Sequence, residues 1–593
     1  MILETIKSRQ DLKNLSLEQL NILCQELRQV LISTVTQNGG HLASNLGVVE
    51  LTVAMEYVFD DNDKIVWDVG HQSYVHKLLT SRFEKFATLR QKDGLCGFPD
   101  VEESPTDAFN TGHASTSISA ALGIACARDV KNEDFNVIAV VGDGALTGGQ
   151  TYEALNNIQN TKMFIVFNDN EMSIGKNVGS ATRNLSKTRV GSYDKNKIKL
   201  QNFLNKIPYF GPHLFNFIKK VLRAHKLRVM PNLYFDNFDL KYLGPIDGHN
   251  LKDLIFYFEG LKNNVLKSTV LHVRTTKGKG FSKAEENPEV WHKYLPETTD
   301  THPVSAKRVG EKLVQLANEN QKVVAITAAM GYSVGLGDFQ KQFPKRFFDV
   351  GIAEEHATTF AGGLASQGLK PYFVVYSTFL QRGYDQILHD VATQKLPVTF
   401  LIDNSGFVGG DGQTHQGLFD LSYLGNIPNL TILSATTDQQ LQEALDFSLT
   451  FDGPLAIRYT KTVLDNPVGL NKDLSWNVVQ KGKKIAVISV GAVATQQVLE
   501  AFWGNEDVEI VFATSIKPLD EKYLATAKDK IILTVEDNVL LGGFGQSVQA
   551  KVDQKVHTLG VNDKFVRHAT VKEQLIENGL DSQSIKDFVK NLL

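Results

Sequence analysis

The chain has 593 residues, of which 42% are hydrophobic and 22% are charged, a composition typical of globular proteins. This length exceeds what one hydrophobic core can organise, so we expect about three or four domains. The formal net charge of −4 gives no overall attraction to nucleic acid or to an anionic membrane, and we expect neither as a partner.

Cysteine usage and the N-terminus indicate the compartment. The three cysteines, Cys24, Cys96 and Cys126, form no CxxC pair and no metal-ligand spacing, which favours a reducing environment. The first residues lack the basic and apolar regions of a signal peptide, and no apolar run is long enough to span a membrane. These features predict a cytoplasmic enzyme.

Two short apolar runs lie between residues 136 and 167. Residues 136–141 and 162–167 are rich in β-branched and aromatic side chains and predict buried parallel strands. The segment from about 148 to 159 has apolar residues at helical spacing, so the three segments predict a βαβ unit. Asp143 and Asn170 follow the two strands, at the sheet edge where open α/β sheets bind ligands.

The chemistry of these two strand ends suggests a cofactor. Asp143 lies in a Gly-Asp-Gly turn and Asn170 ends an Asn-Asp-Asn triplet 27 residues later. A carboxylate and an amide oxygen suit Mg²⁺, and glycines let backbone amides approach a diphosphate. The spacing matches the thiamin diphosphate motif. A tight strand-to-helix turn is the structural alternative.

Strand patterns are missing between residues 175 and 230, and this segment is basic. A nucleic-acid-binding patch is one interpretation. A solvated, partly mobile insertion near an anionic active site is favoured, because its aromatic residues follow short amphipathic helices rather than stacking platforms.

Two further α/β series follow a polar linker at 296–303. Predicted strands of the second series are 322–327, 372–376, 398–402, 431–434 and 455–457, and those of the third are 485–490, 509–512 and 531–535. Strands that alternate with helices predict doubly wound, mostly parallel sheets. We therefore expect three such α/β domains, at 1–302, 303–478 and 479–593. The glycines at 542–545 indicate a strand-to-helix turn rather than a second nucleotide site.

The second domain offers a candidate for cofactor activation. Thiamin catalysis needs a buried carboxyl group that hydrogen-bonds to the pyrimidine ring, and burial favours proton sharing. Glu354 follows an apolar segment and precedes a helix of small residues. Its alternative role is a carboxylate that interacts with the helix dipole. Phe379 follows another strand and either stacks on the pyrimidine or packs in the core.

Seven motifs together resemble the 1-deoxy-D-xylulose-5-phosphate synthase family, and the similarity runs nearly end to end. They are HLASNLGVVELT (41–52), WDVGHQ (67–72), TGHASTSIS (111–119), NDNEMSI (168–174), GPIDGH (244–249), YSTFLQR (376–382) and DGQTHQG (411–417). This combination distinguishes the chain from transketolase and from pyruvate dehydrogenase E1, although the fold it implies is transketolase-like.

The resemblance implies a reaction and a set of partners. Pyruvate would be decarboxylated on thiamin diphosphate and joined to D-glyceraldehyde 3-phosphate, which gives 1-deoxy-D-xylulose 5-phosphate and CO₂. This product feeds non-mevalonate isoprenoid, thiamin and pyridoxal synthesis. The resemblance further implies a homodimer, with the cofactor held between the first and second domains of one chain.

The resemblance also implies roles for individual residues. Mg²⁺ would be bound by Asp143, Asn170 and the backbone carbonyl of Met172. Catalytic roles would fall to Glu354, His41, His71 and His415, and His292 resembles a further family histidine. The other cofactor contacts would be His71, His113, Ala114, Ser115, Gly144, Ala145, Lys277, Phe281, Phe379 and Arg382. Substrate contacts would be His41, Tyr376, Asn404, Asp411, His415 and Lys461.

The chain departs from the family where the aldehyde phosphate would bind. Three positions usually occupied by arginine are Asn404, Lys461 and Gly331, and residues 98–107 carry acidic and apolar side chains in place of basic ones. Arginine can donate two hydrogen bonds to a phosphate. Losing one charged contact weakens the binding free energy by about 1.5–3 kcal/mol. Our hypothesis is that acceptor affinity is reduced or shifted. A related thiamin-dependent transferase with another aldehyde acceptor, or a non-catalytic thiamin-binding homologue, are the alternatives.

Overall fold

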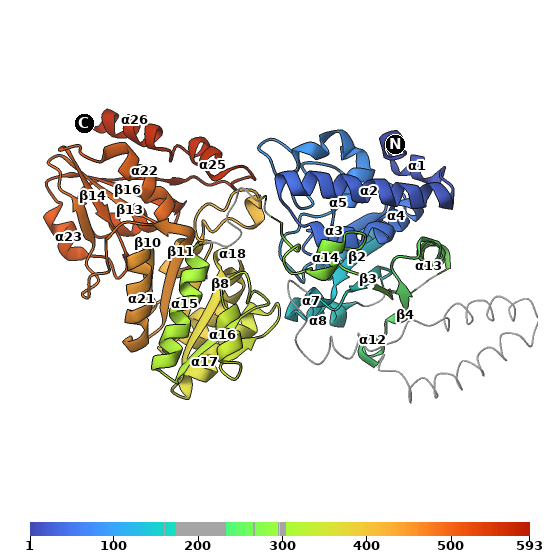
Figure 1. The fold of residues 1–593 in the computed structure, drawn as a ribbon, viewed down its shortest axis with the longest axis horizontal. Helices are drawn as coiled ribbons and strands as arrows, with labels where there is room; N and C mark the ends of the chain where they lie inside the picture. Colours follow the sequence, from blue (N-terminus) through green and yellow to red (C-terminus); the bar gives the residue numbers. More distant parts are fainter. Residues whose placement is uncertain (159–160, 173–232, 265–266, 295, 297–303) are drawn as a thin grey trace, which may run out of the picture. The chain divides into compact units, whose positions relative to one another are not determined.

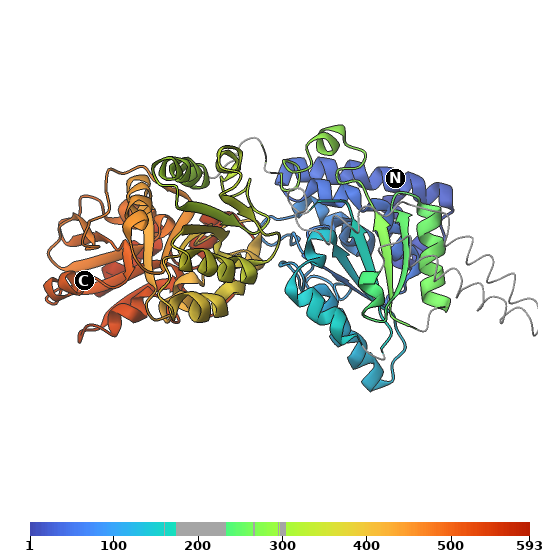
Figure 2. The same cartoon turned by 90° about the horizontal axis from the view of Figure 1, so that it is seen from below.

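The computed structural model describes residues 1–158, 161–172, 233–264, 267–294, 296 and 304–593. The basic segment at 175–230 lies outside the described residues. The chain forms two compact units, one of Met1–Leu89 with Gly94–Pro296, the other of Arg90–Asp93 with Glu297–Leu593. Both units can be followed in Figure 1 and Figure 2.

The first unit is built on one five-stranded sheet. Its order is β1-β2-β3-β5-β4, and every neighbouring pair is parallel. The strands are β1 (Lys64–Trp67), β2 (Val137–Gly142), β3 (Phe164–Asp169), β4 (Lys241–Asp247) and β5 (Thr269–Arg274).

The predicted βαβ unit is confirmed within this sheet. β2 and β3 are neighbouring parallel strands, and α8 (Gly149–Asn157) lies between them in sequence. A short helix that was not predicted, α7 (Asp143–Leu146), begins at the aspartate of the Gly-Asp-Gly turn. Gly142 is in register with Asn168, so the two polar strand ends meet at one edge of the sheet.

Apolar stripes explain how the helices of this unit pack. In α2 (Leu17–Asn38), the buried residues recur at helical spacing from Leu20 to Val35, and a Ser16–Gln19 capping box starts the helix. The next long helix, α4 (Val49–Val58), is almost entirely buried and carries two acidic residues, Glu50 and Glu56. Buried carboxylates need ionic partners, and Arg28 and Arg9 provide them.

The remaining helical segments of the first unit are short or cover its sheet. They are η1 (Leu3–Thr5), α1 (Arg9–Lys13), α3 (Leu42–Gly47), α5 (Tyr74–Lys77), η2 (Leu78–Arg82), η3 (Phe83–Thr88), α6 (Ser117–Lys131), α12 (Leu233–Asp236), α13 (Leu251–Asn264) and α14 (Ser282–Glu286).

The second unit contains two sheets. The larger one has the order β15-β10-β11-β9-β8-β6-β7, parallel except for the antiparallel edge pair β10–β15. Its strands are β6 (Val323–Thr327), β7 (Phe347–Asp349), β8 (Lys370–Tyr376), β9 (Thr399–Asp403), β10 (Thr431–Thr437), β11 (Leu455–Leu464) and β15 (Ser515–Lys517). β15 follows residue 479 in sequence, so one strand crosses the expected domain boundary.

The other sheet has the order β12-β14-β13-β16-β17, parallel except for its edge strand β12. Its strands are β12 (Asn477–Gln480), β13 (Ile485–Val490), β14 (Val508–Phe512), β16 (Ile531–Val539) and β17 (Val556–Val561). The chain thus forms three mostly parallel sheets flanked by helices, which confirms the predicted α/β fold class.

Helices connect the strands of the second unit. They are α15 (Val304–Glu319), α16 (Gly337–Gln342), α17 (Glu354–Ser366), α18 (Ser377–Leu380), η4 (Gln381–Gly383), α19 (Tyr384–Gln386), η5 (Ile387–Ala392), η6 (Gly412–Thr414), α20 (Asp420–Gly425), α21 (Asp438–Thr450), α22 (Ala492–Phe502), α23 (Glu521–Thr526), α24 (Phe544–Gln549), α25 (Val571–Glu577) and α26 (Ser582–Leu592). The glycines at 542–545 form the predicted strand-to-helix turn before α24. None of the described helices is long and apolar enough to cross a membrane.

Candidate active site

The ends of β2 and β3 bring Asp143 and Asn170 together. Asp143 is 2% exposed, and its Oδ1 accepts a hydrogen bond from the Gly144 backbone nitrogen at 2.8 Å. Its Oδ2 accepts hydrogen bonds from the backbone nitrogens of Asn170 and Met172, each at 3.1 Å. The three predicted metal ligands are therefore neighbours around one carboxylate.

The electrostatics of this carboxylate favour a bound cation. Burial, together with the charge of Asp169, raises the pKa of Asp143 to about 7. A cation would offset the cost of holding the charged form there. The described residues include no group of three His, Cys, Asp or Glu side chains placed to hold a metal. An ion here would instead take one carboxylate with amide and carbonyl oxygens, the hard donor set of Mg²⁺.

A tight backbone cradle lies beside these strand ends. Ser115 has a φ of 70°, and its hydroxyl donates to the Ala145 carbonyl at 2.8 Å. A Cβ on Gly148 would lie 2.1 Å from that hydroxyl oxygen, so only glycine fits. Asp68 accepts from the backbone nitrogens of Ser115 (2.7 Å) and Ser117 (3.0 Å). Sequence reasoning assigned no role to Asp68, although it lies in a quoted motif.

Three imidazoles gather in the first unit. The ring centroids of His41 and His71 are 5.3 Å apart, and that of His292 lies 5.6 Å from His41 and 5.2 Å from His71. The Phe98 ring packs edge-on against His41 at 5.6 Å. The structure thus brings together two histidines predicted as catalytic and the third that the resemblance indicated less firmly.

Protonation of two of these histidines, His71 and His292, is unfavourable. Burial, with a contribution from the charge of Lys277, lowers the pKa of His71 to about 3. The same causes hold the pKa of His292 well below its usual range. Burial also lowers the pKa of Lys277 to about 8, against the opposing charge of Asp143. Near neutral pH the imidazoles of His71 and His292 are therefore neutral groups that can share a proton through hydrogen bonds.

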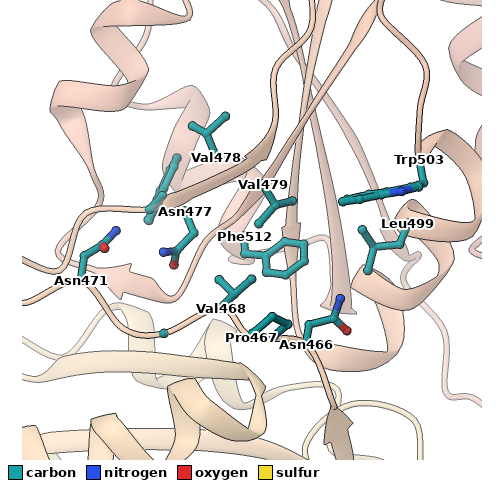
Figure 3. Close-up of a pocket in the computed structure, with 12 residues that line it drawn as sticks. Asn466, Pro467, Val468, Asn471, Asn477, Val478, Val479, Leu499, Trp503 and Phe512 are labelled. Atoms are coloured by element: carbon teal, nitrogen blue, oxygen red, sulfur yellow. The ribbon is translucent and has the colours of Figure 1, made fainter.

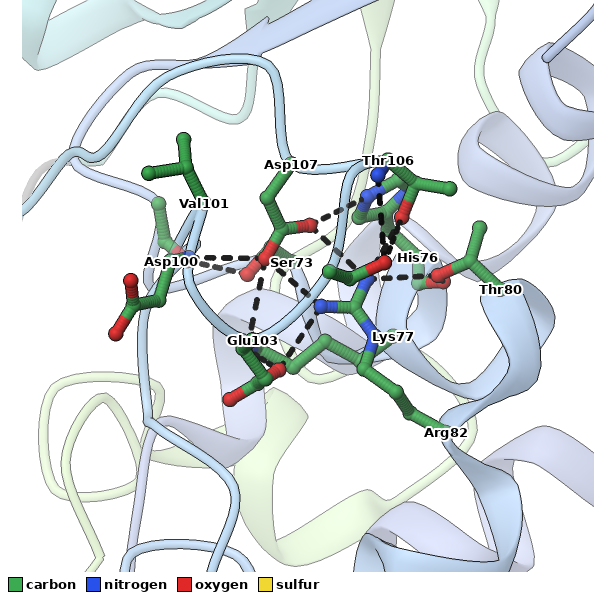
Figure 4. Close-up of polar contacts among 12 residues, drawn as sticks. Ser73, His76, Lys77, Thr80, Arg82, Asp100, Val101, Glu103, Thr106 and Asp107 are labelled. Atoms are coloured by element: carbon green, nitrogen blue, oxygen red, sulfur yellow. Dashed lines mark hydrogen bonds and ion pairs between the residues drawn. The ribbon is translucent and has the colours of Figure 1, made fainter.

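A buried ionic network anchors the loop that carries Phe98. His76 lies between two carboxylates, with Nδ1 2.6 Å from Glu56 and Nε2 2.9 Å from Asp107. Arg82 pairs with both Asp107 oxygens at 2.8 and 2.9 Å. Asp107 also accepts from the Asp100 backbone nitrogen at 2.9 Å. Figure 4 shows His76, Lys77 and Arg82 beside Glu103 and Asp107 of the loop at 95–107, which we call the Phe98 loop.

The charges of this network support one another. Glu56 and Asp107 raise the pKa of His76 against the opposing effect of burial. Arg9 and His76 lower the pKa of Glu56 to about 2, again against burial. The acidic residues of the Phe98 loop are a departure from the family in sequence, and two of them have a structural role. Asp107 anchors the loop, and Glu103 pairs with Arg82 and Lys77.

The second unit places Glu354 at the first position of α17. The side chain is buried, with the residue 3% exposed, and its Oε2 has no hydrogen-bond partner among the described residues. Burial raises the pKa of Glu354 to about 7, while the charge of Arg382 opposes the shift. A buried carboxyl group with one unused oxygen is suited to share a proton with a ring nitrogen.

Aromatic side chains follow β8 close to this sheet edge. The Tyr376 and Phe379 rings stack with centroids 5.6 Å apart, and Phe379 packs edge-on against His415 at 5.5 Å. His415 follows η6, and its Nδ1 lies 2.8 Å from the Thr414 hydroxyl. Three residues predicted for substrate and cofactor contact therefore form one aromatic group.

The predicted acceptor residues lie on neighbouring backbone segments. Asp411 is 5% exposed, and its Oδ1 accepts from Arg90 Nη1 at 2.6 Å. Lys461 Nζ donates to the Val408 carbonyl at 3.0 Å. Asn404 follows β9 with a φ of 55°, the left-handed conformation that asparagine tolerates. Sequence reasoning missed Arg90, whose ion pair with Asp411 joins residues 321 positions apart in the chain.

Other predicted contacts have mixed surroundings. Ala114 is 7% exposed beside the Ser115 cradle, His113 is half-buried, and Lys277 is 5% exposed. The Phe281 ring packs edge-on against Trp291 at 5.0 Å, so core packing accounts for its position. A Cβ on Gly331 would lie 3.3 Å from Phe347, which leaves little room for a longer side chain without a shift.

A separate cavity of about 700 Å³ lies at the β12 edge of the third sheet (Figure 3). Its walls include Trp503, Phe512 and Leu499, with Asn466, Asn471 and Asn477 around them. None of its lining residues is ionisable, and it contains none of the predicted site residues. The lining of this cavity therefore offers no acid–base group.

Family models match the chain along most of its length. Residues 3–275 match the model described as 1-deoxy-D-xylulose-5-phosphate synthase. Residues 303–466 match the transketolase pyrimidine-binding domain, and residues 474–585 match the transketolase C-terminal domain.

Full-length relatives share the first of these descriptions. The 1-deoxy-D-xylulose-5-phosphate synthase of Clostridium tetani is 46% identical over 615 residues, covering 100% of this chain and 99% of the relative. That of Caldanaerobacter subterraneus subsp. tengcongensis is 46% identical, covering 99% and 98%. A solved transketolase from Campylobacter jejuni aligns at 17% identity with a TM-score of 0.44, covering 97% of this chain and 100% of that one. Because the two synthases are 46% identical to this chain over nearly the whole of both sequences, the chain belongs to the 1-deoxy-D-xylulose-5-phosphate synthase family.

Proposed function

We propose that this protein is a thiamin diphosphate-dependent transferase that joins pyruvate, with loss of CO₂, to D-glyceraldehyde 3-phosphate. The product would be 1-deoxy-D-xylulose 5-phosphate, a precursor for isoprenoid, thiamin and pyridoxal synthesis. The observation that carries this proposal is Glu354, a buried carboxyl group with an unused oxygen at the start of α17. Full-length membership of the synthase family supports the choice of substrates.

The residues present fit the cofactor and its metal. When bound, thiamin diphosphate supplies the carbon nucleophile that pyruvate decarboxylation requires. Glu354 would hold its pyrimidine ring and Phe379 would flank it, while the cradle at Ser115 and Gly148 would admit the diphosphate. Mg²⁺ would bind at Asp143 with oxygens of Asn170 and Met172, because burial there leaves a carboxylate that needs a cation.

The protein's own groups would manage the protons of the reaction. Glu354, with a pKa near 7, can hold or release a proton at its unused Oε2 near neutral pH. His41, His71 and His292 are close enough to act on one substrate. The neutral imidazoles of His71 and His292 can share a proton with its oxygens through hydrogen bonds. His415 and Tyr376 would orient the acceptor aldehyde beside Phe379.

Product identification tests this function directly. The protein should convert labelled pyruvate and D-glyceraldehyde 3-phosphate into labelled 1-deoxy-D-xylulose 5-phosphate only when thiamin diphosphate and Mg²⁺ are both present. Dialysis against a chelator should abolish turnover, and added Mg²⁺ should restore it. If cofactor binds but no coupled product forms from any aldehyde, the non-catalytic alternative is correct.

The acceptor phosphate site yields a separate prediction. Lys461 offers one charge where the family usually has an arginine, and Asn404 offers none. We expect Lys461→Met to lower kcat/KM for glyceraldehyde 3-phosphate by about 10-fold or more, the effect of losing one charged hydrogen bond. Steady-state kinetics with unphosphorylated glyceraldehyde is the control, and that substrate should lose less than about two-fold.

The converse substitution checks the same idea. Asn404→Arg should raise kcat/KM for the phosphorylated aldehyde without raising it for glyceraldehyde. An equal fall in kcat/KM for both aldehydes in Lys461→Met would show that Lys461 does not bind the phosphate. A native enzyme that strongly favours another aldehyde would support the related transferase instead.

The homodimer implied by the resemblance stays a prediction that light scattering can test.

A further inference from the structure

The predicted acceptor residues Asp411 and His415 lie on one loop, residues 404–417, which we call the acceptor loop. Its two arms are joined by backbone hydrogen bonds between Gly406 and Gly417, at 2.7 and 2.9 Å. Inside this bridge, the Gln416 side chain accepts from the Val408 backbone nitrogen at 2.8 Å. The arms are therefore fixed to each other. The tip at 409–415 is also held by Arg90, which pairs with Asp411 at 2.6 Å, and by the Thr378 hydroxyl, which donates to the Thr414 carbonyl at 3.1 Å.

A further contact with the tip comes from Gln574 in the C-terminal part of the chain. Gln574, on α25, is 0% exposed. Its Oε1 accepts from the Gly409 backbone nitrogen at 3.2 Å, and its Nε2 donates to the Gly409 carbonyl at 3.1 Å. The same Nε2 donates to the Arg567 carbonyl at 2.8 Å. One carboxamide thus pairs with both backbone groups of a loop glycine, as a neighbouring strand would.

Close backbone contacts reinforce this anchor. Gly409 has a φ of 80°, and a Cβ there would lie 3.3 Å from the Ala569 carbonyl oxygen. Gly412 has a φ of 67°, and a Cβ there would lie 3.0 Å from the backbone nitrogen of His568. The segment at 567–571 therefore lies directly against the tip, and glycine is needed for this approach.

We propose that Gln574 is a positioning residue for the acceptor aldehyde, acting through the acceptor loop. This inference rests on the proposed function, since it assigns the acceptor to Asp411 and His415. Gln574 binds Gly409, which lies two positions before Asp411 in the sequence. These side-chain hydrogen bonds of Gln574 reach neither Glu354 nor the histidines of the first unit. Losing the anchor should therefore affect aldehyde capture and leave the handling of pyruvate and cofactor unchanged.

A volume-matched substitution separates this role from general stability. Gln574→Met fills the same space but removes all three hydrogen bonds. We expect kcat/KM for glyceraldehyde 3-phosphate to fall by about 10-fold to 100-fold, because small displacements of positioning groups are costly in catalysis. The KM for pyruvate and the affinity for thiamin diphosphate should change less than about two-fold.

Gln480→Met is the matched control. Gln480 lies on β12 of the third sheet, and its Nε2 donates to three backbone carbonyls, those of Phe502, Asn505 and Val508. It makes no hydrogen bond to the acceptor loop, so its loss should destabilise the protein without changing aldehyde kinetics. If both variants lose aldehyde efficiency equally, or Gln574→Met loses none, the positioning role is wrong.

Hydrogen exchange tests the anchor without relying on turnover. Amides of the peptide spanning 404–417 should exchange about 10-fold faster in Gln574→Met than in the native protein, and at the native rate in Gln480→Met. Unchanged exchange in Gln574→Met would overturn the proposal even in an active enzyme. A native protein that makes no product while the exchange difference is observed would instead refute the proposed function.

Discussion

Replacing Glu354 with glutamine should lower kcat by about 10²–10⁴-fold, the usual contribution of a positioned proton-transfer group. The substitution keeps the size of the side chain but removes its ability to share a proton near pH 7. Thiamin diphosphate should still bind, because the diphosphate and metal contacts lie on other residues. The measurement is steady-state turnover at saturating pyruvate and aldehyde, with cofactor binding followed by calorimetry.

Glu355 provides the control on the same helix. It is more exposed than Glu354, and Glu355→Gln should keep near-native turnover.

Because the folded-state pKa of Glu354 is raised from 4.5 to about 7, its charge destabilises the cofactor-free fold increasingly as pH rises through this window. Cofactor-free Glu354→Gln should therefore be more stable than the native protein at pH 8, by about 3 kcal/mol. Full turnover of Glu354→Gln with cofactor bound would show that Glu354 takes no part in the reaction.

Replacing His76 with leucine should destabilise the first unit by about 3–5 kcal/mol, because two buried carboxylates would lose their shared partner. The change should also free the Phe98 loop, which Asp107 anchors. Differential scanning calorimetry can measure the shift of the transition. Replacement of His389 by leucine is the control, since its ion pair with Asp390 is exposed and should contribute little.

The pH dependence of this loss has a defined window. Glu56 has a lowered pKa, so its contribution is present above its usual value of 4.5 and is lost as pH falls toward 2. His76 has a raised pKa, so its contribution is complete below 6.5 and is lost as pH rises through the folded-state value. The stability difference between native and His76→Leu should therefore be largest between about pH 4.5 and 6.5. A difference independent of pH would mean that packing, not charge, dominates.

Local pattern was enough to predict much of the fold and the parts of the site that follow strands. Asp143 and Asn170 end strands that neighbour each other, so their meeting follows from βαβ geometry alone. Glu354 was predicted to open a helix, and α17 begins there. These features depend on a few consecutive residues, which is the range over which hydrophobic periodicity and turn chemistry act.

Contacts between distant segments could not be predicted in this way. Arg90 reaches Asp411, Asp68 holds Ser115, and Gln574 holds Gly409, all across large separations in sequence. β4 was missed because Gly244 and Pro245 interrupt its apolar pattern, and the three-residue β15 gives too short a signal. The roles of Asp143, Asn170 and Glu354 follow from strand ends and helix starts, those of the other site residues follow from the family resemblance, and all of these roles stay predictions.

The strand β15 has a practical consequence for making fragments of this protein. It covers one edge of the seven-stranded sheet by pairing with β10, although it lies beyond the expected boundary at 478. A fragment that ends at residue 478 would expose the backbone of β10 as an open edge, which invites intermolecular strand pairing. Such a fragment should precipitate or form aggregates on expression, whereas residues 304–593 produced as one piece keep that edge covered.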